Sequence, residues 1–264
     1  MSALLSRLLR LSPHTPPVTL ETVPREAFSD AFLRELHAFA NGLMAEGLEH
    51  FGVHARSNDV VHVFRQGDGA GRIVGFQFWK AEPLGLPRGR AIIGGKLRIH
   101  PDFRQRGLHL LSGLTFLVQE KLRHPTHQHY RLSIASPFGF VSITEALAWY
   151  RPFEPRPRTE EERALREAFL ALAAQSHFEV DEASGLFDVH IHMTAETLGR
   201  YPPAYFERPA ARAYAALNPD FRTNGRYVGF WFRFTPDNLA ALTRATLHRL
   251  MGRRARGTRA QGDT

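Results

Sequence analysis

The chain has no cysteine among its 264 residues, which removes several kinds of chemistry. Disulfides, cysteine nucleophiles and thiolate metal sites are excluded, and the composition agrees with a cytosolic (cytoplasmic) enzyme. The sequence also lacks an apolar run of transmembrane length, and its N-terminus has no long apolar core or small-residue cleavage site. We therefore expect neither a membrane span nor a signal peptide.

The remaining composition is typical of a globular protein, with 43% hydrophobic and 23% charged residues. The formal net charge of +8 suits an anionic cofactor or an acidic partner. No nucleic-acid-binding motif appears, so no nucleic acid is expected as partner. We find no internal repeat or clear linker. The sequence thus predicts an N-terminal extension over 1–17, a single α+β domain over 18–251 with an enlarged portion at 156–226, and a disordered basic tail over 252–264.

A predicted strand and a predicted helix flank the most informative stretch of the sequence. The strand covers Ala91 to Ile99, where apolar residues and glycine alternate, and it should stop before Pro101 because proline cannot donate to a ladder. After a short loop, five apolar residues fall at helical spacing and indicate a helix that ends near His124: Leu110, Leu111, Leu114, Val118 and Leu122.

The loop between them reads Arg104, Gln105, Arg106, Gly107, Leu108, His109. A glycine-bearing loop that opens a helix directs unpaired backbone N–H groups and the positive end of the helix dipole at one point. With two arginines beside it, the favoured anion is a phosphate or pyrophosphate. The alternative interpretation is a basic surface turn before an ordinary core helix.

This arrangement resembles the GNAT superfamily of acyl-CoA-dependent N-acyltransferases, in which a strand and a V-x-P-like turn precede R/Q-x-x-G-x-G/A at the start of a helix. Ile99, His100 and Pro101 match the turn, and Arg104 to His109 match the loop, with His109 where the family has Gly or Ala. The resemblance implies an α+β fold with a seven-stranded mixed sheet flanked by helices. It also implies acyl-CoA as co-substrate, with acetyl as the default acyl group.

The resemblance further implies roles for particular residues. The pyrophosphate would lie on the amides of Gln105 to His109, and the pantetheine would pair with the backbone of Leu97, Arg98 and Ile99 like an added strand. Tyr150 matches the position of the acid that protonates the departing thiolate, although it could equally be a packed aromatic residue at the edge of the core.

The general base is not evident, because the strand before the loop offers Lys96, Arg98 and His100 but no carboxylate. His100 is one candidate, and His190 and His192, which alternate with Asp188 on a predicted strand, are others. Two histidines so spaced could also hold a metal, but no complete ligand set is visible and we expect none.

The predicted seven strands are Val18–Val23, Val60–Phe64, Ile73–Trp79, Ala91–Ile99, Tyr130–Ala135, Leu186–His192 and Tyr227–Phe234. The predicted helices include one capped by Ser29, a second piece near Leu43 to Phe51, one over Ser142 to Tyr150 after a break at Ser136 to Gly139, and one through Met251.

Two other functions stay open beside an N-acyltransferase for a small-molecule or peptide amine. His109 and the missing carboxylate would suit a GNAT-fold binding or sensing module, or a relative with other chemistry on an acyl thioester. The third possibility is a basic interaction protein whose loop binds an anion. The oligomeric state cannot be read from the sequence.

Overall fold

The computed structural model describes residues 17–42, 47–67, 71–104, 106–189, 193, 198–199 and 201–251. They form two compact units. Unit 1 holds the described residues up to Ala81, Gly94–Arg123 and those from Leu242 onward, and unit 2 holds Glu82–Ile93 and His124–Ala241. Strand β4 (Gly89–Ile99) and helix α10 (Pro236–Met251) contribute residues to both. The single domain over 18–251 stays a prediction.

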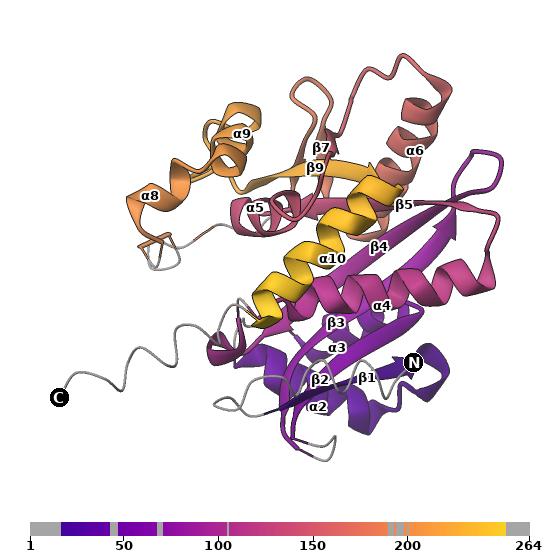
Figure 1. Ribbon diagram of the computed structural model, residues 1–264, viewed down its shortest axis with the longest axis vertical. Helices are drawn as coiled ribbons and strands as arrows, with labels where there is room; N and C mark the ends of the chain where they lie inside the picture. Colours follow the sequence, from indigo (N-terminus) through magenta and orange to yellow (C-terminus); the bar gives the residue numbers. More distant parts are fainter. Residues whose placement is uncertain are drawn as a thin grey trace. The chain divides into compact units, whose positions relative to one another are not determined.

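The sheet of unit 1 has the strand order β1-β2-β3-β4 (Figure 1). Its first three strands are β1 (Val18–Pro24), β2 (Val60–Gln66) and β3 (Ile73–Pro83), and each pairs antiparallel with the next. β2 and β3 therefore form an antiparallel pair of consecutive strands. A short 3-10 helix, η1 (Arg25–Ala27), follows β1.

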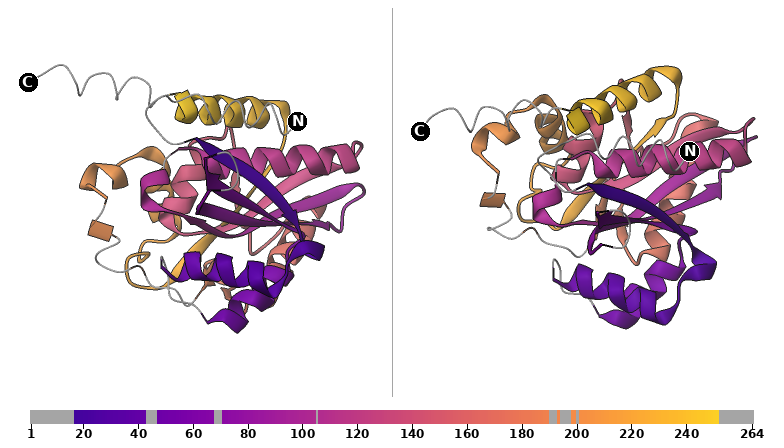
Figure 2. Two further views of the ribbon diagram at one scale, coloured as in Figure 1. Left: turned by 90° about the horizontal axis from the view of Figure 1, so that it is seen from below. Right: turned by 60° about the horizontal axis from the view of Figure 1, so that its bottom comes forward.

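Two helices cover one face of this sheet, α2 (Asp30–Asn41) and α3 (Leu48–Arg56), and α4 (Leu108–Arg123) lies on the other face (Figure 2). Ser29 caps α2 as expected, since its hydroxyl accepts from the Phe32 N–H at 3.2 Å. Phe51, Phe76 and Phe78 form the centre of the core under α2 and α3. The second helical piece, expected near Leu43 to Phe51, begins only at Leu48, and residues 43–46 lie outside the described residues.

A buried polar network attaches α4 to its face of the sheet. The Trp79 indole N–H donates to Ser112 Oγ at 2.7 Å, and the same oxygen lies 2.8 Å from His62 Nδ1. His62 and Ser112 are both fully buried. Burial lowers the pKa of His62 to about 4, because a charged imidazolium would have to leave water. His62 is therefore neutral at neutral pH.

The sheet of unit 2 has the order β4-β5-β9-β8-β7, with β6 paired to β9. Its strands after β4 are β5 (Gln128–Ala135), β6 (Arg151–Pro152), β7 (Glu179–Asp181), β8 (Leu186–Asp188) and β9 (Arg226–Arg233). The pairing of β4 with β5 is parallel, and the others are antiparallel. All seven expected strands are present among the described residues, and β6 and β7 are two short strands that the sequence did not predict. The mixed α+β class is confirmed.

The helices of unit 2 include one correction. The helix expected over Ser142 to Tyr150 is instead α5 (Pro137–Thr144), because Ser136 accepts from the Gly139 N–H and Pro137 occupies the first turn. Proline is favoured there, where its missing N–H costs nothing, so the expected breaker is in fact a helix start. The other helices in this unit are α6 (Glu160–Gln175), α8 (Pro203–Phe206) and α9 (Pro209–Leu217).

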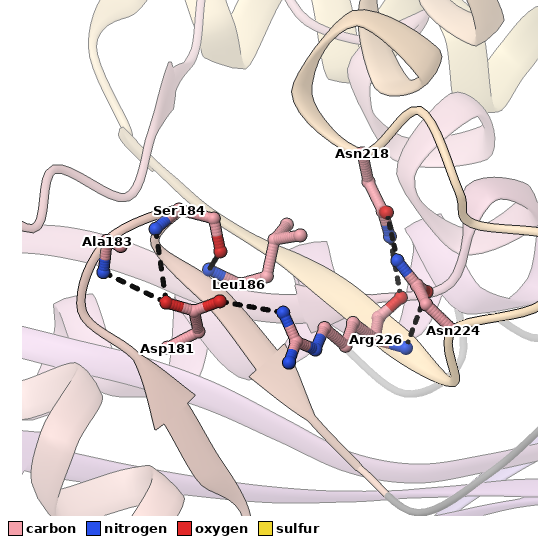
Figure 3. Close-up of polar contacts among 7 residues, drawn as sticks. All are labelled: Asp181, Ala183, Ser184, Leu186, Asn218, Asn224 and Arg226. Atoms are coloured by element: carbon pink, nitrogen blue, oxygen red, sulfur yellow. Dashed lines mark hydrogen bonds and ion pairs between the residues drawn. The ribbon is translucent and has the colours of Figure 1, made fainter.

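The turn between β7 and β8 is tied to β9 by Asp181 (Figure 3). Its carboxylate accepts from the Ala183 and Ser184 backbone N–H groups and from Arg226 Nη1 at 2.7 Å. Those hydrogen bonds, first that of Ala183, hold the pKa of Asp181 below its ordinary value. The aromatic residues of β9, Phe230, Trp231 and Phe232, are buried and belong to the core.

Candidate functional site

The two halves of strand β4 have different neighbouring strands. Its parallel register with β5 runs from Gly89 opposite Gln128 to Ile93 opposite Leu132. In unit 1 the following residues, Gly94–Ile99, form the last strand of the sheet, with β3 as neighbour. An edge strand presents backbone N–H and C=O groups that can pair with an extended ligand. Leu97, Arg98 and Ile99, the expected pantetheine-binding residues, lie in this part of the strand.

A tight turn ends β4 and leads into the loop. His100 caps the 3-10 helix η2 (Pro101–Phe103), since its Nδ1 accepts from the Asp102 N–H at 3.3 Å. Phe103 is buried, and it fixes the turn against the core of unit 1. The structure therefore gives His100 a role in the turn. Its role as a base stays a prediction.

The two arginines of the loop are held close to this turn. Arg104 Nε donates to the Ile99 carbonyl at 3.2 Å, and the Arg106 guanidinium carbon lies 4.3 Å from the centre of the Phe103 ring. Gln105 lies outside the described residues. The local sequence thus places two guanidinium groups between the end of β4 and the start of α4.

Gly107 is the residue that lets the chain enter α4. Its φ of 72° is in the left-handed region, which residues with a Cβ atom rarely adopt. Its carbonyl accepts the first helical bond, from the Leu111 N–H at 3.0 Å. The preceding amides, including those of Leu108 and His109, have no helical carbonyl to bond, and the first turn of α4 has no acidic side chain. No side chain in the first turn of α4 therefore neutralises the positive end of the helix dipole.

Helix α10 adds a third arginine to this region. A Cβ on Gly107 would lie 3.2 Å from Arg249 Cβ, so Arg249 packs against the glycine. Arg249 Nη1 is 3.4 Å from His109 Nε2, and since guanidinium only donates, that nitrogen accepts. The bulky side chain at His109 is thus engaged with α10. Arg104, Arg106, Arg249 and the start of α4 together make this part of unit 1 strongly cationic, and a phosphate group fits its donors.

Tyr150 belongs to unit 2, in a non-helical segment just before β6. Its ring contacts Phe140 and Phe230 edge-on, at centroid distances of 5.3 and 6.0 Å. Asn238 positions the residues before it, because its Oδ1 accepts from the Ala148 and Trp149 N–H groups at 3.0 Å each. Burial raises the pKa of Tyr150, so the phenol keeps its proton at neutral pH and can act as a donor.

Other expected residues are not described. His190 and His192 lie outside the described residues, and β8 ends at Asp188, since Val189 is already outside the strand that was expected to run to His192. Within the described ranges, no group of three or more His, Asp or Glu gathers in a way that could hold a metal ion. In the same part of the chain, no helix has the length and hydropathy needed to cross a bilayer.

The sequence did not identify three residues next to this site. A Cβ on Gly95 would lie 3.1 Å from His54 Nε2 and 3.3 Å from Asn58 Oδ1, so both side chains lie against β4. Arg249 is the third. The only local signal was Gly95 itself, because a glycine inside a strand often marks a close approach of another group.

No protein-family model and no curated protein matches the chain. Among solved structures, an acetyltransferase of Trypanosoma brucei is 18% identical, with a TM-score of 0.38 over 54% of this chain and 99% of its own. NAA60 of Arabidopsis thaliana in complex with acetyl-CoA is 14% identical, with a TM-score of 0.34 over 51% and 91%. Ard1 of Thermoplasma volcanium is 11% identical, with a TM-score of 0.33 over 82% and 98%. Such low scores assign no activity to this chain.

Proposed function

We propose that the chain is an acyl-CoA-dependent N-acyltransferase that moves an acyl group to an amine of a small molecule or peptide. The observation that supports this most is the continuity, within unit 1, of an edge strand with a cationic helix start. Gly94–Ile99 offers backbone hydrogen bonds, and the loop that follows directly offers arginines and the amides of α4. CoA has both matching parts, a pantetheine arm with two amides and a pyrophosphate.

In this proposal the pantetheine amides pair with Leu97 to Ile99 as an added strand. The pyrophosphate lies at the start of α4, where Arg104 and Arg106 add charge-assisted hydrogen bonds. Acetyl is the default acyl group, and longer chains are left to experiment. Because the arm is extended along β4, the thioester lies toward the middle of the strand.

The chemistry is a direct attack. The amine nitrogen forms a bond to the thioester carbonyl carbon, the C–S bond breaks, and CoA leaves as the thiol. The amine must lose a proton and the thiolate must gain one, so a base and an acid are needed. We assign Tyr150 as the acid, because it matches the position at which many GNAT members place that group.

The cofactor site is tested by charge reversal of the loop arginines. The double variant Arg104→Glu/Arg106→Glu should bind acetyl-CoA about 100- to 10,000-fold more weakly, because it removes two charge-assisted hydrogen bonds that contribute about 1.5–3 kcal/mol each. Isothermal titration calorimetry with acetyl-CoA measures this. The arginines are preferable to Gly107, since any side chain there would also disturb the packing of Arg249.

The matched control is Arg34→Glu/Arg72→Glu, which changes the net charge equally at two exposed positions of unit 1. It should bind acetyl-CoA like the wild type at moderate salt. Equal weakening in both double variants would show only a general charge effect and would contradict the assigned site. Binding without thiol release from acetyl-CoA, over a panel of small amines and peptides with free α-amino groups, would favour a binding module.

Tyr150→Phe tests the assigned acid. The variant should lower kcat about 100-fold and leave the Kd for acetyl-CoA unchanged, because the lost proton donor acts only in the transition state. Tyr130→Phe is the control, since it removes a phenol that donates to Glu161 in the same unit. Unchanged kcat in Tyr150→Phe would remove Tyr150 from catalysis.

A further inference from the structure

We infer that Arg249 of α10 is a third phosphate-binding residue for the acyl-CoA donor, and that His109 positions its guanidinium. This inference rests on the proposed function and extends the cofactor site to the last helix of the chain. The sequence motif from Ile99 to His109 gives Arg249 no role, since the arginine lies far beyond it in the chain. The assignment also gives a reason for a histidine, in place of Gly or Ala, at position 109.

The end of α10 lies over Gly107, beside the start of α4 (Figure 1). A Cβ on Gly107 would lie 3.2 Å from Arg249 Cβ, 3.8 Å from Arg249 Cδ and 3.7 Å from the Thr246 carbonyl oxygen. These residues all belong to unit 1. The absence of a side chain at Gly107 therefore lets the aliphatic stem of Arg249 pass close to the loop.

His109 contacts the other end of the Arg249 side chain. Arg249 Nη1 lies 3.4 Å from His109 Nε2, which must be the acceptor because a guanidinium only donates. The distance is long for a hydrogen bond, so this contact orients the guanidinium without binding it strongly. Both residues are half-buried. Because a guanidinium has five N–H donors in one plane, it can donate to His109 and to a phosphate oxygen together.

The charges around this point favour a phosphate as the ligand. Arg104, Arg106 and Arg249 bring three guanidinium groups to the start of α4, where the helix dipole adds positive charge. The carboxylate of Asp102, in the preceding turn, is exposed and lies 3.6 Å from His100 Nδ1. Like charges gathered in this way repel one another. A phosphate group accepts from several guanidinium groups at once and offsets that repulsion.

The alternative is a purely structural role for Arg249. It lies in the last turn of α10, where a cation interacts favourably with the dipole of its own helix, and its stem packs on Gly107. A structural contribution would change the stability of α10 and would not depend on a phosphate. An ion pair with a phosphate, in contrast, weakens as salt screens it. The salt dependence of cofactor binding therefore separates the two roles.

The experiment compares Arg249→Met with Arg244→Met, which removes an exposed arginine of the same helix. Methionine keeps an unbranched apolar stem and removes every donor. Calorimetry measures the Kd for acetyl-CoA at low and at high salt. Arg249→Met should bind about 10-fold more weakly at low salt, and its difference from the wild type should shrink at high salt. Arg249→Lys, which keeps the charge, should recover part of the affinity, and Arg244→Met should bind like the wild type.

His109→Ala tests the positioning role, since it removes the imidazole and keeps the backbone amide. It should weaken acetyl-CoA binding about threefold in the wild type and have no effect in the Arg249→Met background, because the contact is already lost there. His109→Gln should bind nearly like the wild type, because its amide oxygen can accept from Arg249. Equal effects of His109→Ala in the two backgrounds would remove His109 from the positioning of Arg249.

The results that would overturn the role of Arg249 leave the proposed function intact. One is a wild-type Kd in folded Arg249→Met at low salt. The other is a loss of affinity that is equal at both salt concentrations and equal in Arg249→Lys, which would show an effect of packing. If Arg249→Met does not fold, Arg249→Lys is measured in its place, with a smaller loss expected. Wild-type protein that binds no acetyl-CoA would overturn the proposed function and this inference with it.

Discussion

The two faces of the sheet in unit 1 each hold a histidine, and the two side chains differ in how far they are buried. His62 of β2 lies under α4, fully buried, with Nδ1 at 2.8 Å from Ser112 Oγ. His54 of α3 lies on the opposite face, half-buried, with Nε2 directed at the backbone of β4. One side chain type thus appears once inside the core and once at the end of a helix, packed against a strand.

The difference lies in the side chain as a whole and not in Nε2. At His62, the second ring nitrogen, Nε2, is buried without a hydrogen-bond partner in the described structure, so an added proton would bring an unpaired charge into the core. At His54, Nε2 is buried as well, although the side chain as a whole is only half-buried. A half-buried histidine is therefore not by itself an accessible base.

The largest effect that would test this comparison is a loss of stability at acid pH that comes from His62. Its pKa in the folded state, about 4, is below its ordinary value of 6.5, so the unfolded chain binds the proton more tightly. The contribution is complete above pH 6.5 and falls as the pH decreases toward 4. At pH 5 the free energy of unfolding should be lower by about 2 kcal/mol.

His62→Phe isolates this contribution from those of other groups. At pH 7.5 the variant should be less stable by about 1 kcal/mol, because the Ser112 hydroxyl loses a partner. Between pH 6.5 and 5, however, it should lose about 2 kcal/mol less than the wild type. Urea unfolding at pH 7.5, 6.5 and 5 measures both. Parallel pH dependences in the two proteins would mean that His62 is protonated in the folded state and that the comparison is wrong.

The sequence predicted the part of the site that is local in the chain. The alternation in Ala91 to Ile99, the stop at Pro101 and the helical spacing after Gly107 are all determined within a few residues. The structure confirms each of them as β4, η2 and α4. The positive φ at Gly107 agrees with the expectation that this loop needs a glycine.

The sequence could not predict contacts between distant segments. Nothing near His54 indicates that α3 packs on Gly95, because that contact depends on how the helix crosses the sheet. The contact of Arg249 with Gly107 likewise joins the last helix to the middle of the chain. The error at α5 had another cause. Ser136 and Pro137 can end a strand and can equally begin a helix, and the sequence analysis read them only as the end of the preceding strand.

The smallest expected effect concerns Asn58, whose side chain is bonded to the end of α3. Asn58→Ala removes the hydrogen bond to the His54 carbonyl and should lower the free energy of unfolding by about 1–2 kcal/mol, because Asn58 is buried. Ser57→Ala is the control, since Ser57 also donates to the His54 carbonyl at 2.8 Å but is exposed. Its loss of stability should be smaller, because water can replace the exposed hydroxyl. Urea unfolding of both variants measures the two losses. Equal losses would mean that burial of the Asn58 side chain adds nothing to the contribution of its hydrogen bond.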